Sequence, residues 1–307
     1  MITGESSGVL TGVLNLTPVE PQVFDDAFEG TTGPCPWPKA YGGDLVAQAA
    51  AAAMRTAGED RSLNSMHSYF LRPADIGASV RYEVERLRDG RGYSTRQVRA
   101  FQNGKVVYAA LASFAVGEDT EDYAPSAPTG VPNPEDLPSS AEYLEDAGLE
   151  GTMTELSREY WASGRSFDMR HVPGPVYLRV DGEPQPHQAV WVRPFDGLVD
   201  VAGLTTPMRD AAALAYVCDY TILEPVLRVL GHPWAQEGLV TASLDHAMWF
   251  HRAPSIEGWL LYAQEAVTAH SGRGLGLGRF FTREGTHLAT VAQEGLIRVT
   301  PARGTPR

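Results

Sequence analysis

Apolar and polar residues along the chain follow patterns that predict two groups of strands, each associated with a helix. Residues 80–85 (VRYEVE) alternate strictly, as a strand that buries one face does. Residues 44–56 are instead rich in alanine, a strong helix former, and follow the break at Gly42-Gly43. Strands of the first group are predicted at residues 65–72, 80–88, 93–102 and 106–116, with hairpin turns at 89–92 and 102–105.

The second group of elements comes after a segment rich in proline. Residues 118–164 predict a linker with a short helical stretch around 141–163. A long helix is expected at 208–230, ended by Gly231 and kinked or divided at Pro225. Strands are predicted at residues 166–172, 187–194, 239–251, 259–268, 274–282 and 287–300. We therefore expect three parts, which are a first repeat at 1–117, a linker at 118–165 and a second repeat at 166–307.

The two groups share residues at a spacing of about 180 positions. The matching pairs are Phe70 and Phe250, Arg72 and Arg252, Tyr82 and Tyr262, and Glu85 and Glu265. A period this long indicates a duplicated domain and not a short-period repeat protein. Because strands do not alternate with helices, we expect an α+β fold in which an antiparallel sheet wraps a long helix. The glycines of residues 274–278 are similar to a dinucleotide-binding loop, but a strand is expected there, which argues against a Rossmann fold.

Composition narrows the class of protein further. At 307 residues the chain is long enough for two domains, and 43% hydrophobic with 21% charged residues is typical of soluble globular proteins. No apolar run reaches the length of a membrane helix, and the first residues lack the pattern of a secretory signal. Two cysteines, Cys35 and Cys218, do not make a disulfide framework, so we expect a cytoplasmic protein. A net charge of -13 argues against nucleic acid as a partner.

Several longer motifs carry a resemblance to one family. They are YGG at 41–43, HSYFLRP at 67–73, LRDG at 87–90, LDHAMWFHR at 244–252, WLLY at 259–262 and QEGLIR at 293–298. In this order, and over roughly 38–116 and 208–298, the chain resembles the type II acyl-CoA thioesterases. The resemblance implies a double hotdog fold and hydrolysis of fatty acyl-CoA to a free fatty acid and CoA. It also implies no metal or redox cofactor, and a homo-oligomer, a dimer or larger, formed through sheet edges.

The resemblance also implies a catalytic site. The family's aspartate, its serine or threonine, and its glutamine fall on Asp219, Ser243 and Gln293. One departure is Asp44, where the family commonly has glutamine after the two glycines; this puts in doubt any role for the start of the first helix. The first-copy counterpart of Gln293 is Ala112, which indicates one catalytic centre per chain.

The chemistry of these residues agrees with hydrolysis, although each also has a structural explanation. Asp219 lies in an apolar helical stretch, where it lines a polar site or else faces a solvated seam or a structural cation. Strand alternation over residues 241–250 puts Ser243 on the face opposite Met248, and Gln293 shares its face with Val291. The chain has no Gly-x-Ser-x-Gly elbow and no evident histidine base for Ser243. We therefore favour water, activated by Asp219 and oriented by Ser243 and Gln293, as the attacking group.

Candidates for substrate binding are His67, Arg91 and Arg273, because CoA is anionic and requires local positive charge. The structural alternatives are a satisfied strand histidine and solvated charges on strand faces. Cys218 is more simply a packed thiol than a nucleophile. Two other functions stay open. One is a catalytically silent acyl-CoA-binding or scaffold protein, and the other is a hotdog enoyl-CoA hydratase, which requires a histidine with a carboxylate.

Overall fold

The first half of the chain follows the predicted order of helix and strands. The computed structural model describes residues 6–147 and 153–300. Its first half has helices α1 (Ser6–Leu14) and α2 (Gly42–Met54). The strands are β1 (Thr17–Val19), β2 (Asp26–Thr31), β3 (Arg61–Phe70), β4 (Ser79–Asp89), β5 (Tyr93–Gln102) and β6 (Lys105–Val116). Helix α2 and strands β3 to β6 confirm the elements predicted there, whereas the sequence pattern does not predict α1, β1 and β2.

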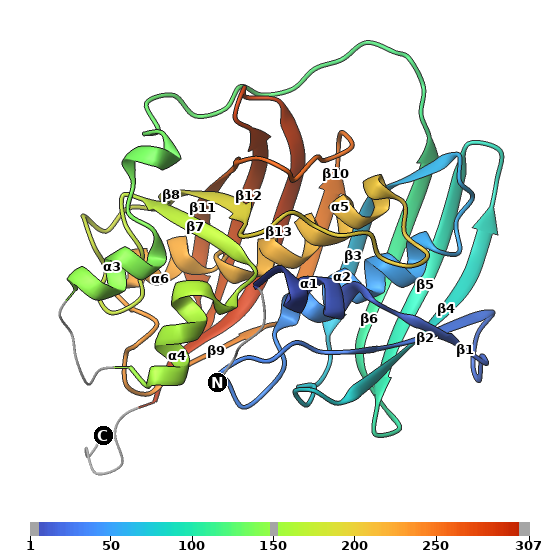
Figure 1. Cartoon of the computed structure of the whole chain (residues 1–307), viewed down its shortest axis with the longest axis horizontal. Helices are drawn as coiled ribbons and strands as arrows, with labels where there is room; N and C mark the ends of the chain where they lie inside the picture. Colours follow the sequence, from blue (N-terminus) through green and yellow to red (C-terminus); the bar gives the residue numbers. More distant parts are fainter. Residues whose placement is uncertain (1–5, 148–152, 301–307) are drawn as a thin grey trace.

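The linker leaves β6, runs along the upper edge of the view past the strands of the second repeat and then forms short helices (Figure 1). They are η1 (Pro134–Asp136), α3 (Ser140–Asp146), α4 (Glu155–Glu159) and η2 (Tyr160–Gly164). Residues 148–152, within the helical stretch predicted at 141–163, lie outside the described residues. So do residues 1–5 and 301–307, which belong to the predicted repeats.

The second half repeats the plan with a divided helix. Its helices are α5 (Thr206–Val217), the 3₁₀ turn η3 (Cys218–Tyr220) and α6 (Glu224–Leu230). Its strands are β7 (Phe167–Val172), β8 (His187–Pro194), β9 (Leu239–Ser243), β10 (Asp245–Phe250), β11 (Leu260–His270), β12 (Arg273–Thr282) and β13 (His287–Val299).

Two elements of the second half differ from the sequence prediction. The helix predicted at 208–230 divides at residues 218–223 and not at Pro225. Pro225 lies in the first turn of α6, where its missing N–H has no helical partner to lose. The strand predicted at 239–251 is interrupted at Leu244, between β9 and β10. Both interruptions matter because they lie at the candidate site.

All of these strands join one antiparallel sheet. Its order is β1-β2-β4-β5-β6-β3-β10-β13-β12-β11-β8-β7, and β9 pairs with β13 beside this path. The two repeats meet edge to edge where β3 pairs with β10, with Met66 opposite Met248. The edge-to-edge pairing expected of this fold thus occurs within the chain, and pairing between chains stays a prediction. This is the predicted α+β double hotdog, two tandem repeats with central helices on one face of the sheet (Figure 1).

The core lies between the sheet and two helices that pack against each other, α2 and α5. Every residue from Ala49 to Ala53 is fully buried on α2. Small alanine side chains let this helix approach both its partner and the strands, which is why an alanine-rich segment forms a central helix. None of the helices among residues 6–147 and 153–300 is long and apolar enough to cross a membrane.

Candidate active site

Asp219 lies in the turn that separates α5 from α6. This turn, at residues 218–220, carries the Asp219 carboxylate to the first turn of α2. A Cβ atom on Gly42 would lie 2.6 Å from Asp219 Oδ2, so the approach requires glycine there. The Gly43 N–H donates a hydrogen bond to the same carboxylate. Because a helix N-terminus carries the positive end of the helix dipole, α2 stabilises the negative charge of Asp219.

Ser243 and Gln293 both contact the other carboxylate oxygen of Asp219. Ser243 Oγ donates to Asp219 Oδ1 at 3.0 Å. Gln293 Nε2 donates to the same Oδ1 at 2.6 Å and to Ser243 Oγ at 3.0 Å. The three residues that the family resemblance singled out therefore form one hydrogen-bonded cluster, made by η3, β9 and β13.

The direction of Ser243 corrects one detail of the sequence analysis. Alternation over residues 241–250 predicts that Ser243 and Met248 lie on opposite faces of the sheet. Met248 is fully buried on the helix side, yet Ser243 also points to that side, where Asp219 lies. The pairing with β13 slips by one residue between Ser243 and Ala247, and a one-residue slip reverses the alternation. Gln293 does share its buried face with Val291, as predicted.

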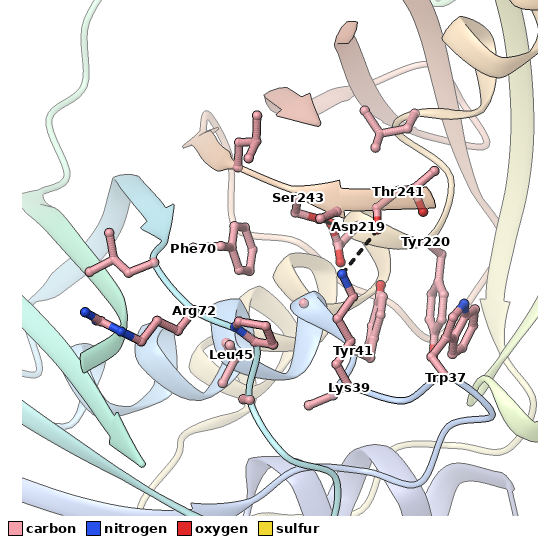
Figure 2. A pocket seen from close by; sticks show the side chains of 18 of the residues that line it. Trp37, Lys39, Tyr41, Leu45, Phe70, Arg72, Asp219, Tyr220, Thr241 and Ser243 are labelled. Carbon is pink, nitrogen blue, oxygen red and sulfur yellow. Dashed lines mark hydrogen bonds between the residues drawn. The ribbon is translucent and has the colours of Figure 1, made fainter. Parts of the chain in front are cut away.

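The charge of Asp219 is set by burial and by its donors. Burial raises the pKa of the Asp219 carboxyl above its ordinary value. Hydrogen bonds from Gln293 and Ser243 and the positive charge of Lys39 oppose this rise. Lys39 is partly buried, its Nζ donates to Thr241 O at 3.2 Å, and burial lowers the pKa of its ammonium (Figure 2). A carboxylate with a raised pKa is a stronger base, which suits proton transfer.

A cavity of about 260 Å³ opens beside Asp219. Figure 2 shows Phe70 and Arg72 on one side of Asp219, and Trp37 and Tyr220 on the other. The cavity therefore has one end with an arginine and one aromatic end, with the carboxylate cluster between them. Such a shape fits a long ligand that is anionic at one end and apolar at the other.

The predicted binding residues lie elsewhere. His67 is exposed on the outer face of β3, and its ring meets the edge of Trp249 at 5.0 Å between centroids. Arg91 is exposed in the turn between β4 and β5. Arg273 Nε forms an ion pair with Glu294 at 3.1 Å. None of the three lines the cavity, whose own cationic residues are Lys39 and Arg72. A role for His67, Arg91 and Arg273 in substrate binding stays a prediction.

Sequence reasoning missed the contribution of the segment before α2. Lys39 and Tyr41 line the cavity, and the ring of Tyr41 stacks on Tyr220 with 4.0 Å between centroids. Tyr41 also fixes the helix contact, since its hydroxyl donates to Tyr216 O at 2.7 Å. This segment has no regular apolar pattern, so only the YGG motif, which includes Tyr41, could have indicated it.

Asp44, the departure from the family pattern, lies outside the cavity. It is 1% exposed, and its Oδ2 accepts a hydrogen bond from the Gly33 N–H at 2.9 Å. Burial raises the pKa of the Asp44 carboxyl to about 7. Asp44 therefore packs behind the first turn of α2, and its side chain is not among those that line the site.

Cys218 precedes Asp219 but points into the core. Its Sγ donates to Ala215 O at 3.1 Å and lies 3.1 Å from His246 Nε2. Burial raises the pKa of the Cys218 thiol well above its ordinary value and lowers the pKa of His246 to about 4. The packed thiol expected from the sequence is confirmed. Within residues 6–147 and 153–300, no group of three or more His, Cys, Asp or Glu residues is arranged to hold a metal ion.

Comparison with known proteins gives a consistent result. Residues 33–115 match the family model "Acyl-CoA thioesterase N-terminal domain", and residues 133–297 match "Acyl-CoA thioesterase C-terminal domain". The chain is 34% identical over 301 residues to acyl-coenzyme A thioesterase 8 of Homo sapiens, covering 96% of this chain and 90% of that protein. It is 33% identical over 298 residues to acyl-CoA thioesterase 2 of Haemophilus influenzae, covering 95% and 99%.

A solved structure agrees with these matches. The crystal structure of an acyl-CoA thioesterase II, TesB2, from Mycobacterium marinum has a TM-score of 0.72 and 32% sequence identity to this chain. The match covers 97% of this chain and 99% of that one. Two family models, relatives at about one third identity over nearly the whole chain, and a shared fold lead to one conclusion. The chain belongs to the type II acyl-CoA thioesterase family.

Proposed function

We propose that this acyl-CoA thioesterase hydrolyses fatty acyl-CoA to a free fatty acid and CoA by direct attack of water. The observation that carries the proposal is the hydrogen-bonded cluster of Asp219, Ser243 and Gln293, in which Asp219 and Ser243 line the cavity and Gln293 is buried next to them. A carboxylate, a hydroxyl and an amide at this spacing can hold one water molecule and accept its proton.

Asp219 is the proton acceptor in this scheme. As the water oxygen bonds to the thioester carbonyl carbon, one of its protons passes to Asp219. The tetrahedral intermediate then breaks its C–S bond, and the sulfur leaves as the CoA thiolate, which takes up the proton held by Asp219 and so restores the carboxylate. The raised pKa of Asp219 favours the first transfer.

Gln293 supports the position of the water in two ways. Its Nε2 fixes Asp219 and Ser243, as described above. Its Oε1 is buried, and no group among residues 6–147 and 153–300 donates a hydrogen bond to it. A buried acceptor without a donor is costly, and a water molecule that donates to it would remove this cost. The same water would lie beside the Asp219 carboxylate.

The first turn of α2 supports the other half of the reaction. The thioester carbonyl oxygen gains negative charge in the transition state, and the positive end of a helix dipole stabilises such charge. Gly42 lines the cavity at this turn. At the opposite end, Arg72 is exposed at the cavity mouth and suits the phosphates of CoA.

The two other candidate functions have less support. A hydratase requires a histidine with a carboxylate at the substrate, and among the described residues that line the cavity there is no histidine. The buried pair of His171 and Glu224, 3.1 Å apart, has neither member on the cavity wall. A silent binding protein would have no need for the carboxylate cluster, whose buried charge is costly to keep.

The test is release of free CoA thiol from acyl-CoAs by the wild type and by Asp219→Asn. We expect kcat to fall by about 10²- to 10⁴-fold in the variant, the usual contribution of a general base. Asp168→Asn is the matched control, because this carboxylate is also buried in the second repeat but lies outside the cavity. An Asp219→Asn enzyme that folds and keeps wild-type kcat would refute the proposal.

Ser243→Ala separates water attack from a serine nucleophile. If water attacks directly, Ser243→Ala keeps more activity than Asp219→Asn and no acyl group is found on the protein by mass spectrometry. An acyl adduct on Ser243 during turnover would show that the serine attacks.

A further inference from the structure

The aromatic end of the cavity is lined by three tryptophans from distant parts of the chain. Trp37, Trp161 and Trp234 all line it. The rings of Trp37 and Trp161 are 5.8 Å apart between centroids, and those of Trp161 and Trp234 are 6.1 Å apart. We call these three side chains the tryptophan wall. They form one continuous aromatic surface beyond Asp219, next to Tyr220.

The middle ring of the tryptophan wall, Trp161, is backed by packed side chains, and the partly buried Trp37 and Trp234 pack against the same cluster. Trp161 is 5% exposed and packs with Leu144 and Tyr177 in a buried cluster behind the cavity. The guanidinium of Arg165, itself 1% exposed, lies 4.7 Å from the centre of the Trp161 ring. A wall with this support cannot move outward without breaking the packing behind it.

A buried carboxylate fixes the third ring of the wall. Trp234 Nε1 donates to Glu224 Oε1 at 3.0 Å. Glu224 is fully buried, and its other oxygen lies 3.1 Å from His171 Nε2 and 3.0 Å from Gln188 Nε2. Because these partners come from β7, β8 and α6, the position of Trp234 is set by the second repeat as a whole.

The side of the cavity that takes the acyl group follows from charge. CoA carries its phosphates at the end remote from the thioester, and Arg72 lies on one side of Asp219 (Figure 2). With the thioester beside Asp219, the acyl group must extend to the other side, toward Trp37 and Tyr220. It therefore meets the tryptophan wall.

The volume of the cavity indicates how large an acyl group can fit before it meets the tryptophan wall. One water molecule takes about 30 Å³ in the liquid, and a methylene group is of similar size, so a cavity of about 260 Å³ holds on the order of nine heavy atoms. The thioester and the end of the CoA arm take part of this volume.

We infer that the tryptophan wall limits the acyl group to compact chains of about eight carbons or fewer, flat aromatic acyl groups included. The inference rests on the proposed function, because it assumes that the thioester lies beside Asp219. It makes Trp37 and Trp234 specificity-determining residues: they bound the space for the acyl group and take no part in the chemistry.

Two readouts over one substrate series test the inference. The series is straight-chain acyl-CoAs from 2 to 16 carbons, kept below their micelle concentrations, together with phenylacetyl-CoA. The first readout is kcat/KM for thiol release by the wild type. The second is the Kd of the same compounds for Asp219→Asn, measured by calorimetry. We expect kcat/KM and affinity both to fall at least tenfold between 8 and 12 carbons, with phenylacetyl-CoA among the better substrates.

Trp37→Leu is the variant that opens the wall. It should raise kcat/KM for the 12-carbon substrate at least tenfold relative to the 6-carbon one. Trp234→Leu should act in the same direction, with a lower Tm because Glu224 loses a donor. Trp249→Leu is the matched control, since Trp249 is on the outer sheet face beside His67, and its length profile should equal that of the wild type.

The outcomes separate the two proposals. If the wild type binds and hydrolyses hexadecanoyl-CoA as well as octanoyl-CoA, the inference is wrong and the proposed function stands. A folded Trp37→Leu with an unchanged length profile also overturns the inference. If no thiol is released but binding shows the length limit and Trp37→Leu relaxes it, the hydrolytic proposal fails and the inference stands.

Discussion

The two repeats of this chain share a fold but treat the same position on the sheet in opposite ways. In the first repeat Arg96 on β5 pairs with Ala112 on β6. At the matching place in the second repeat, Gly276 on β12 pairs with Gln293 on β13. A long charged residue next to a small one has been exchanged for a glycine next to an amide. Both pairs face the central helices. The residues at these positions therefore determine how closely the helix segment can approach the sheet.

Arg96 fastens the end of the helix in the first repeat. It is 1% exposed, its Nε donates to Thr56 Oγ1 at 3.0 Å, and its Nη2 donates to Thr56 O at 2.9 Å and Asp89 Oδ1 at 2.8 Å. Thr56 follows the last turn of α2, where a positive charge is favourable. The buried Arg96 side chain therefore occupies the space between the end of this helix and the sheet.

Gly276 allows the helix segment of the second repeat to reach the strand. A Cβ atom on Gly276 would collide with Ile222 O in the turn between η3 and α6. This close approach is possible because α5 stops at Val217, and the same interruption brings Asp219 to Gln293. The comparison shows that a break in the helix and a missing side chain on the sheet together make room for the site.

Gln293→Ala gives the second repeat the residue of the first, and its expected effect is the largest among the substitutions that test this comparison. A hydrogen bond to a charged group contributes about 1.5–3 kcal/mol, so kcat should fall roughly 10- to 100-fold. The measurement is thiol release under saturating substrate, with Tm as a check on folding. The reciprocal change, Ala112→Gln, should leave kcat unaltered because no carboxylate meets that position. If Gln293→Ala had the same kcat as the wild type, Gln293 would have no role in catalysis.

The sequence predicted the strands of both repeats and the exchange of Ala112 for Gln293, because strand patterns and motifs are local features. It did not predict the roles of Arg96 and Gly276. Residues 93–102 and 187–194 carry their strand pattern in their own side chains, and their bounds agree with β5 and β8. Asp219, Ser243 and Gln293 were identified through the resemblance to the family's motifs, and only Asp219, in an apolar helical stretch, is atypical for its surroundings. What could not be predicted depends on contacts between distant segments. The slip of pairing between Ser243 and Ala247 is one example, since it is set by β13 and not by the strand itself.

Arg96→Met should destabilise the first repeat without changing the catalytic site of the second. Buried acceptors such as Thr56 O would lose their donor, at a cost of about 2–3 kcal/mol in the free energy of unfolding. Urea denaturation measures this loss, and kcat of the folded enzyme should be retained. Arg86→Met is the matched control: its ion pair with Asp26 is partly exposed, with the Arg86 side chain 47% exposed, and contributes at most about 1 kcal/mol. A similar loss in both variants would contradict a special role for Arg96.

Lys39→Met tests whether the first repeat also takes part in the chemistry. Lys39 precedes α2, yet its ammonium lowers the pKa of Asp219 in the second repeat. Asp219 must be ionised to accept a proton, so activity is present above its pKa and is lost as the pH falls through it. Without Lys39 that pKa rises further, and the acid limb of kcat/KM against pH should move to higher pH.

The expected change in kcat for Lys39→Met is only a few-fold above the acid limb, where Asp219 is ionised in both proteins. Lys105→Met controls for the loss of one positive charge, because Lys105 is an exposed lysine at the start of β6. If both variants keep the wild-type acid limb, Lys39 has no electrostatic effect on Asp219. If only Lys39→Met shifts the acid limb, the first repeat also contributes to catalysis and is not a silent copy. The catalytic carboxylate then belongs to the second repeat, while part of the charge that sets its pKa comes from the first.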